Sequence, residues 1–86
     1  MKGKCYYFYV RTGNYDKTER EYCHWEWTNR FTSKEKVSKH FSHGRQTVRK
    51  SEVYSAEQFI KLFSSRASLR RALEEAIKYS GKDGAY

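Results

Sequence analysis

Two segments near the start of the chain carry the pattern of paired strands. Residues 5–12 read C-Y-Y-F-Y-V-R-T, and residues 21–31 read E-Y-C-H-W-E-W-T-N-R-F, in which apolar and polar residues alternate. Aromatic and β-branched residues suit a pleated surface, and alternation indicates a strand with two different faces. The segment between them, 13–20, combines Gly, Asn and charged residues, which favour a turn. We therefore expect an antiparallel hairpin with a rather long loop.

A helix-start signal follows the hairpin. Thr32, with Glu35 three places later, predicts a capping box, in which each side chain satisfies a free backbone N–H group. The short helix after it places Val37 and Phe41 on one face. The His-Gly pair at 43–44 predicts its end, because Gly tolerates the left-handed conformation that closes helices.

The second half of the chain predicts one more strand and more helix. Residues 46–54 alternate weakly and carry charge, which is typical of an edge strand. Ser55 and Gln58 predict a second capping box, and Gly81 predicts the end of the helical region. An apolar stripe faces one side near its end: Leu69, Leu73, Ala76 and Ile77. The Ser-Ser pair at 64–65 favours a break, but no Pro or Gly forbids one continuous helix.

These elements predict an α+β fold in two layers. A ββαβα order, with the last helix either whole or split in two, places helices on one face of a small antiparallel sheet. We expect residues 1–81 to form a single compact domain and residues 82–86 to form a flexible tail. Eight Tyr, five Phe and two Trp supply the bulk that so short a chain needs for its core.

The strand alternation divides the hairpin into two faces. The more apolar face is expected to meet the helices: Tyr6, Phe8, Val10, Cys23, Trp25 and Trp27. The opposite face is then expected to be open: Tyr7, Tyr9, Arg11, Tyr22, His24 and Glu26. Exposed Tyr side chains suit recognition, because they offer a large rigid area and stack on nucleic-acid bases. Cross-strand pairing without any partner, and a homodimer seam, are the alternatives.

Charge adds a second candidate contact region. The chain has 18 Lys and Arg against 10 Asp and Glu, a net charge of +8 that favours an acidic partner such as nucleic acid. Between residues 34 and 50, Glu35 is opposed by a dense basic set: Lys34, Lys36, Lys39, Arg45, Arg49 and Lys50. Such a set suits contacts with phosphates, and a solvated face that discourages aggregation is the alternative.

Catalytic and metal-binding patterns do not emerge from the sequence. The spacing of Cys5 and Cys23 matches no zinc knuckle, and His40 with His43 supplies only half of a zinc site. Cys23 and His24 are neighbours on a strand and point opposite ways, so they do not form a nucleophile and its base. No Gly-rich phosphate loop is present. We therefore expect no enzymatic activity, no metal and no cofactor.

The cysteines and the apolar runs suggest a cytoplasmic protein. Two cysteines are too few for a disulfide framework, and Cys5 and Cys23 fall on opposite faces of the hairpin. We expect Cys23 to be a small core residue. No apolar run approaches the roughly 20 residues of a membrane span, and the start of the chain is not a leucine-rich signal segment.

Two family resemblances arise from these motifs. Residues 30–37, R-F-T-S-K-E-K-V, which follow the hairpin, resemble the arm-site DNA-binding domains of phage integrases over about residues 6–41. Those domains place a small sheet in the DNA groove. The chain departs from them at Val37, where they have Ala, and in continuing into further strand and helices.

Residues 52–59, E-V-Y-S-A-E-Q-F, with the helical stripe after them, are similar to small two-layer α/β anti-CRISPR proteins of phages over about residues 46–80. That resemblance implies a stand-alone inhibitor that binds a CRISPR effector and blocks target DNA. A charge of +8 departs from the acidic, DNA-mimicking members of this class.

The resulting prediction is a small phage or mobile-element accessory protein in the host cytoplasm, monomeric or homodimeric and without membrane contact. It is expected to bind a host protein or nucleoprotein complex as a stoichiometric inhibitor, with a CRISPR effector as the leading candidate. The alternative is a module that binds DNA or RNA directly.

Overall fold

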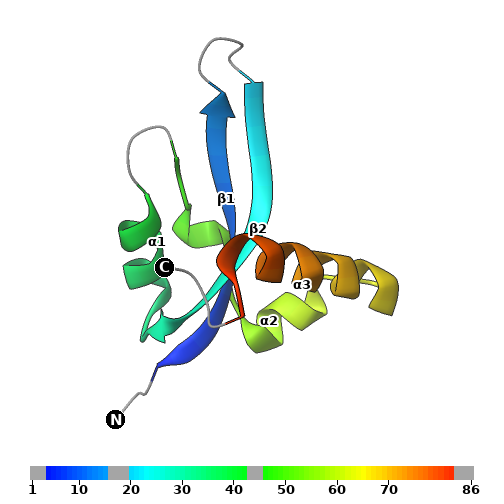
Figure 1. Cartoon of the computed structure of the whole chain (residues 1–86). Helices are drawn as coiled ribbons and strands as arrows, with labels where there is room; N and C mark the ends of the chain where they lie inside the picture. Colours follow the sequence, from blue (N-terminus) through cyan, green and yellow to red (C-terminus); the bar gives the residue numbers. More distant parts are fainter. Residues whose placement is uncertain (1–3, 16–19, 43–45, 83–86) are drawn as a thin grey trace.

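A computed structural model describes residues 4–15, 20–42 and 46–82, with side chains described throughout except at 14, 15 and 20–22 (Figure 1). Within these residues the elements are β1 (Cys5–Tyr15), β2 (Arg20–Phe31), α1 (Lys34–Phe41), the 3-10 turn η1 (Lys50–Glu52), β3 (Val53–Ser55), α2 (Ala56–Lys61) and α3 (Arg66–Ser80). The predicted α+β class and the small antiparallel sheet are confirmed.

The sheet is built around β1, in the order β2-β1-β3. β1 and β2 form a long hairpin whose register places Phe8 opposite Trp27 and Tyr9 opposite Glu26. Both strands extend beyond their predicted limits into the segment that was expected to be loop. The alternation that separates the two faces therefore holds along most of the hairpin.

A register shift bends the open end of the hairpin. Cys5 lies opposite Phe31 and Tyr7 opposite Thr28, so two residues of β1 span three of β2. An extra residue of this kind reverses the facing of the side chains beyond it. Phe31 consequently packs beside Phe41 of α1, with ring centroids 5.9 Å apart.

The segment 46–54 contains less strand than predicted. β3 spans three residues and pairs with β1 at the sheet edge, while Thr47 makes an isolated bridge to Thr12. The turn η1 separates these two contacts. Val48 and Val53 are both buried in one core cluster, although their odd spacing would point them apart in a continuous strand. The turn restores the phase that lets both valines reach the core.

The helix caps are partly as predicted. Ser33, not Thr32, caps α1, and its hydroxyl accepts the N–H of Lys36 at 3.3 Å. The box at the start of α2 is confirmed: Ser55 Oγ accepts the N–H of Gln58 at 3.2 Å, and the Gln58 side chain accepts the N–H of Ser55 at 3.1 Å.

The helical region after Ser55 is split, as the Ser-Ser pair favours. α2 ends at Lys61, and Ser65 caps α3 by accepting the N–H of Ser68 at 3.2 Å. Gly81 closes α3 with a φ of 78°, and its N–H donates to the carbonyl of Ile77 at 2.7 Å. That positive φ is accessible to Gly at little cost.

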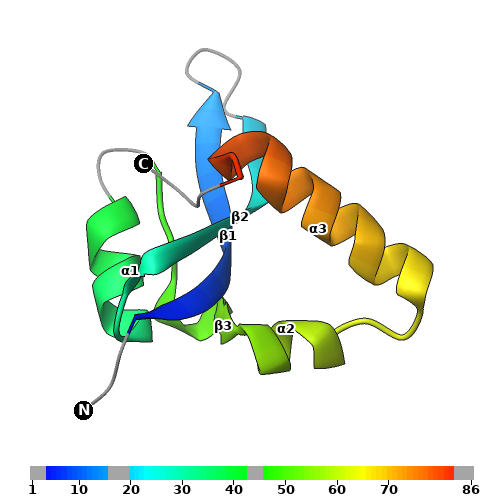
Figure 2. The same ribbon diagram turned by 60° about the horizontal axis from the view of Figure 1, so that its bottom comes forward.

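Helices lie against both sides of the hairpin (Figures 1 and 2). α2 and α3 form the layer over the face that carries Phe8 and the tryptophans, where Phe59 of α2 stacks on Phe8 with centroids 4.2 Å apart. Phe59 also meets the Trp25 ring edge-on at 4.9 Å. α1 and the segment after it cover part of the opposite face.

The C-terminal half of α3 seals the outer edge of β2. The N–H of Trp25 donates to Glu75 Oε2 at 2.8 Å, and the N–H of Trp27 donates to Ser80 Oγ at 2.9 Å. Both N–H groups lie on an edge strand, where they would otherwise lack partners. The N-terminal half of α3 extends away from the sheet (Figure 2).

Candidate binding surfaces

The sheet face that the alternation predicts to be open is covered. Tyr7 is buried and Tyr9 has 0% of its surface exposed, under Val37 and Phe41 of α1. The prediction of an exposed tyrosine surface is therefore wrong. The reason lies in α1: its apolar residues need a sheet face to cover, and α2 and α3 occupy the other one.

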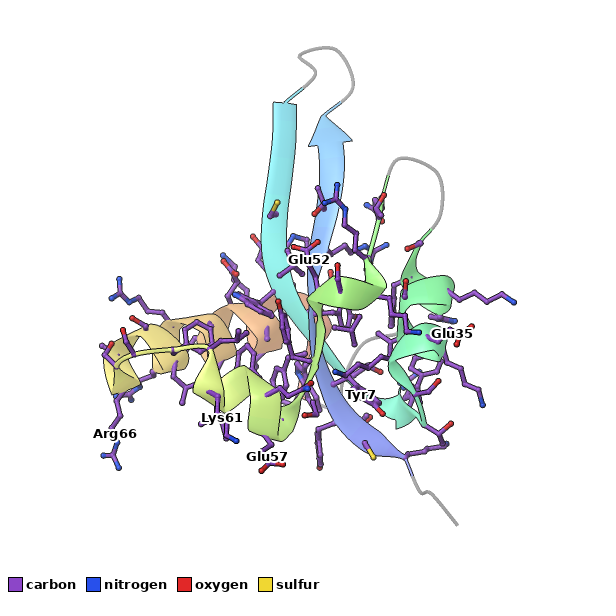
Figure 3. All side chains as sticks on the ribbon, turned by 180° about the vertical axis from the view of Figure 1, so that it is seen from behind. Tyr7, Glu35, Glu52, Glu57, Lys61 and Arg66 are labelled. Carbon is purple, nitrogen blue, oxygen red and sulfur yellow. The ribbon has the colours of Figure 1, made fainter. Side chains whose placement is uncertain are left out.

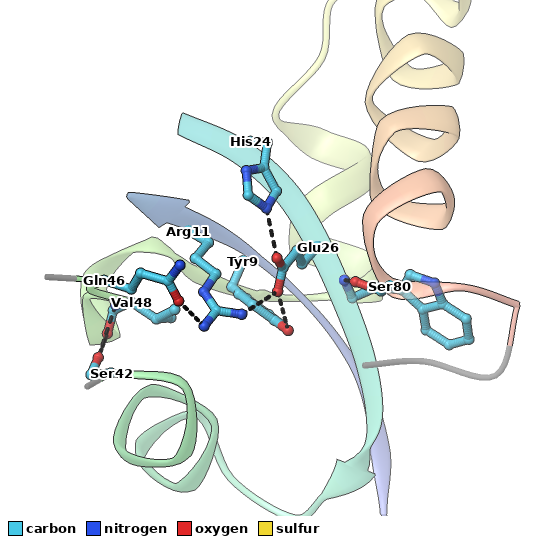
Figure 4. A network of polar contacts seen from close by, with 9 residues as sticks. Tyr9, Arg11, His24, Glu26, Ser42, Gln46, Val48 and Ser80 are labelled. Carbon is cyan, nitrogen blue, oxygen red and sulfur yellow. Dashed lines mark hydrogen bonds and ion pairs between the residues drawn. The ribbon is translucent and has the colours of Figure 1, made fainter. Parts of the chain in front are cut away.

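A buried carboxylate organises the polar groups of this face (Figure 4). Glu26 is 3% exposed, and its Oε1 accepts the hydroxyl of Tyr9 at 3.0 Å. Its Oε2 lies 2.6 Å from His24 Nε2, and Arg11 Nη1 lies 3.5 Å from Oε1. Burial, followed by the charge of Glu26, raises the pKa of Tyr9 far above its ordinary value.

Arg11 links this carboxylate to the segment after α1. Its Nη2 donates to Gln46 Oε1 (Figure 4). Its guanidinium lies over the ring of Phe41, 6.0 Å from the centroid. His24 in turn stacks on Tyr79 of α3, with centroids 4.0 Å apart. The predicted contact residues Arg11 and His24 are thus brought together with Tyr9, but in an internal network that connects three segments. The side chain of Tyr22, another predicted contact residue, lies outside the described residues.

The basic region that the sequence predicts is exposed. Figure 3 shows α1 from behind, with Glu35 pointing away from the sheet. We call the following residues the basic surface: Lys34, Lys36 and Lys39 of α1, with Arg49 and Lys50 at the start of η1. All are exposed except Lys34, which is half-buried and donates to Gln58 Oε1. None forms an ion pair within the described part of the chain, and Arg45 lies outside it.

Hydrogen bonds hold the two halves of the basic surface together. α1 is anchored in the core by Val37 and Phe41. The hydroxyls of Ser38 and Ser42 both donate to the carbonyl of Val48, at 2.5 and 3.1 Å, and the N–H of Val48 donates to Ser42 Oγ at 2.8 Å. The backbone segments that carry the two halves of the basic surface are therefore held in a fixed position relative to one another.

A second exposed surface is not predicted by the sequence. Tyr6 is 56% exposed and Ile77 is 46% exposed, beside a groove between the sheet and α3. We call it the α3 groove; its lining is Tyr6, Phe8, Trp27, Leu73, Ile77 and Lys82. The helical stripe predicts Leu73 and Ile77 in the core, whereas α3 docks through smaller residues, Ala72, Ala76 and Ser80. Their four-residue spacing is the sequence signal that indicates this docking face.

Both cysteines and His40 are exposed in the described residues. Cys5 and Cys23 are exposed and form no disulfide there, so the prediction of Cys23 as a core residue is wrong. His40 is exposed against the ring of Phe41, and His43 lies outside the described residues. No cluster of three metal-ligating side chains occurs in the described segments. Among the described helices, none combines the length and apolar character that crossing a bilayer requires.

Comparisons with protein-family models, curated proteins and solved structures found no match to this chain. The two exposed surfaces are therefore the features of the described residues from which we infer a function.

Proposed function

We propose that the protein is a non-enzymatic binding protein that contacts a nucleic-acid-handling complex through the basic surface and inhibits it stoichiometrically. The observation that carries this proposal is a set of exposed Lys and Arg side chains without ion-pair partners in the described residues, fixed on two interlocked elements. Such a set attracts phosphates, and the fixed position of its two backbone segments reduces the entropy lost on binding. Because the sequence resembles anti-CRISPR proteins, a CRISPR effector is the first complex to test.

A direct nucleic-acid-binding module is the second candidate. On α1 both apolar side chains, Val37 and Phe41, are buried, so the exposed side of this helix carries no large apolar anchor. Protein partners are commonly held by such anchors, while backbone contacts to DNA or RNA require little beyond Lys and Arg. Tyr7 and Tyr9 are buried, so base stacking on the sheet does not support this candidate.

The test compares two charge reversals of equal size. Lys36→Glu with Arg49→Glu changes the basic surface, while Lys61→Glu with Lys78→Glu makes the same change on exposed positions of α2 and α3. Binding is measured by fluorescence anisotropy with duplex DNA, with single-stranded RNA, and with a guide-loaded CRISPR effector. Inhibition of target-DNA cleavage is measured at increasing ratios of protein to effector.

Inhibition that saturates near one protein per effector, and that only the first variant loses, supports the inhibitor. A direct nucleic-acid-binding module is indicated if the protein binds DNA or RNA in the absence of the effector. Four phosphate contacts then predict about a hundredfold weaker binding at 200 than at 50 mM salt. The proposal fails if the two variants behave alike in every assay, or if the unaltered protein binds neither naked nucleic acid nor the effector.

A further inference from the structure

The docking of α3 leaves its larger apolar side chains only partly covered. Ala72, Ala76 and Ser80 are buried, while Leu73 is half-buried and Ile77 is 46% exposed. A helix that served only to close the core would place its larger apolar residues inward, because burying them contributes more free energy. The arrangement of α3 instead presents apolar surface beside the sheet.

The floor of the α3 groove is made of ordered aromatic rings. Tyr6 stacks on Trp27 with centroids 5.7 Å apart, and Phe8 lies 6.5 Å from the same ring. Trp27 Nε1 donates to the carbonyl of Gly81 at 2.8 Å, which fixes the indole against the end of α3. The groove encloses about 240 Å³, room for one or two apolar side chains of a ligand. Preformed apolar hollows of this kind favour binding, since little ordering is needed.

Positive charge continues the line of the groove. Arg66 and Arg70 precede Leu73 and Ile77 on α3 at intervals of four, three and four residues, which places all of them on one side of the helix. The surface around Arg66, Arg70 and Leu73 forms a shallow hollow of about 690 Å³. Arg66 lies at the far end of α3 and points away from the sheet (Figure 3).

The lining of that hollow contains three arginines, Arg66, Arg70 and Arg71, and one acidic residue. Glu74 is the acid in the lining of that hollow, and it pairs with Arg70 at 3.6 Å while both side chains are well exposed. The first turn of α3 contains no acidic residue, so the positive end of the helix dipole adds to the arginines. Along α3, the apolar α3 groove is therefore followed by a positively charged surface at the N-terminal end of the helix.

We propose that the α3 groove binds an amphipathic, acidic segment of a partner protein. Apolar side chains of that segment occupy the hollow beside Tyr6 and Ile77, and its Asp or Glu residues lie along Arg66 and Arg70. A second copy of this chain is disfavoured, because two molecules of charge +8 would bring their arginines together. An anionic membrane is a poorer fit, because the apolar side chains line a concave groove instead of projecting from a face. The inference is independent of the basic surface, which lies across the sheet.

The test selects ligands without assuming a partner. A library of random peptides displayed on phage is panned against the unaltered protein, and the enriched peptides are synthesised. The proposal predicts enriched sequences with apolar residues at helical or alternating spacing and an excess of Asp and Glu. Their binding should shift amide resonances of Tyr6, Leu73 and Ile77 in two-dimensional NMR spectra, while resonances of α1 stay unchanged.

Matched variants locate the binding. Ile77→Ser should weaken the selected peptides about tenfold, while Ile60→Ser, at a 57% exposed position outside the groove, should leave them unaffected. Arg66→Glu with Arg70→Glu should weaken them several-fold, while Lys78→Glu on another side of α3 should not.

Four results would overturn the proposal. They are the absence of any enriched peptide, peptides whose binding ignores Ile77→Ser, sedimentation showing a dimer that Ile77→Ser dissolves, and Ile77-dependent binding to phosphatidylserine vesicles with no peptide selected. None of these results concerns the basic surface. The experiments can therefore contradict the proposal for the α3 groove without contradicting the proposed function, and the reverse.

Discussion

The two faces of the hairpin are closed in different ways. The face with Tyr7 and Tyr9 is the more polar in sequence, yet it is covered closely by α1 and by the segment around Val48. The face with Phe8 and Trp27 is the more apolar, yet it ends in an open groove beside Ile77.

The difference shows that apolar content alone does not decide which face is buried. A tyrosine can be buried completely when its hydroxyl has a partner, as Tyr9 has in Glu26. A tryptophan face can remain partly open when the helix beside it docks through alanines. Four substitutions test this contrast, and they are given in order of decreasing effect on stability.

Glu26→Ala should have the largest effect. It leaves Arg11, His24 and the Tyr9 hydroxyl without their shared acceptor in a buried site, which costs about 3–5 kcal/mol of unfolding free energy. Urea unfolding followed by tryptophan fluorescence measures the loss. Glu26→Gln, which keeps an acceptor for Tyr9, should lose less. Equal losses in the two variants would show that the charge of the network contributes nothing.

Tyr9→Phe should cost about 1.5 kcal/mol at neutral pH, because it removes one hydrogen bond to a buried carboxylate while keeping the ring on Phe41. It should also change the alkaline limb of the stability curve. The folded-state pKa of Tyr9 is raised above the ordinary 10.0, so the unaltered protein loses stability as pH rises past that value. In Tyr9→Phe the decline above pH 10 should be shallower, and parallel curves would contradict the burial of this hydroxyl.

Ser80→Ala should cost about 1 kcal/mol. The N–H of Trp27 loses its acceptor on the edge of β2, at a position that α3 shields from water. Hydrogen exchange of the Trp27 amide should accelerate more than that of Phe8, which pairs within the sheet. Uniform acceleration would mean that α3 does not seal this edge.

Ile77→Ser should change stability least, by less than about 1 kcal/mol, because 46% of its surface is already exposed in the folded protein. Thermal unfolding of this variant is compared with that of Phe59→Ala. Phe59 is buried and stacks on Phe8, so its loss should cost about 3–5 kcal/mol of unfolding free energy. A loss near that of Phe59→Ala would show that Ile77 belongs to the core and would remove the basis for the α3 groove.

The local signals in the sequence predict local structure well. Alternation assigns the hairpin residues to two faces, Ser55 with Gln58 marks the start of α2, and Gly81 marks the end of α3. These features depend on residues near one another in the chain, so a single sequence contains the information. Thr32 misleads because Ser33, beside it, is an equally good cap.

The binding surfaces are harder to predict, because they depend on how distant elements divide the sheet between them. Nothing in Val37 and Phe41 indicates that α1 will cover Tyr9 and leave the tryptophans to α3. Glu26 is recognisable as the centre of a network only when two tertiary features are known. They are the pairing of Tyr9 with Glu26 across the hairpin and the contact of Gln46 with Arg11. The prediction that the basic residues face solvent holds for Lys36, Lys39 and Lys50, because charge alone opposes their burial, whereas Lys34 is half-buried.

The sealing of β2 by α3 couples ligand capture to the integrity of the sheet. The helix that supplies Ile77 to the groove also supplies Glu75 and Ser80 to the edge amides of Trp25 and Trp27. A ligand that held α3 in place would slow solvent exchange at those two amides and raise the melting temperature with its concentration. Detachment of α3 would uncover a strand ready to recruit β-structure from a neighbouring molecule, so an occupied groove would also suppress aggregation.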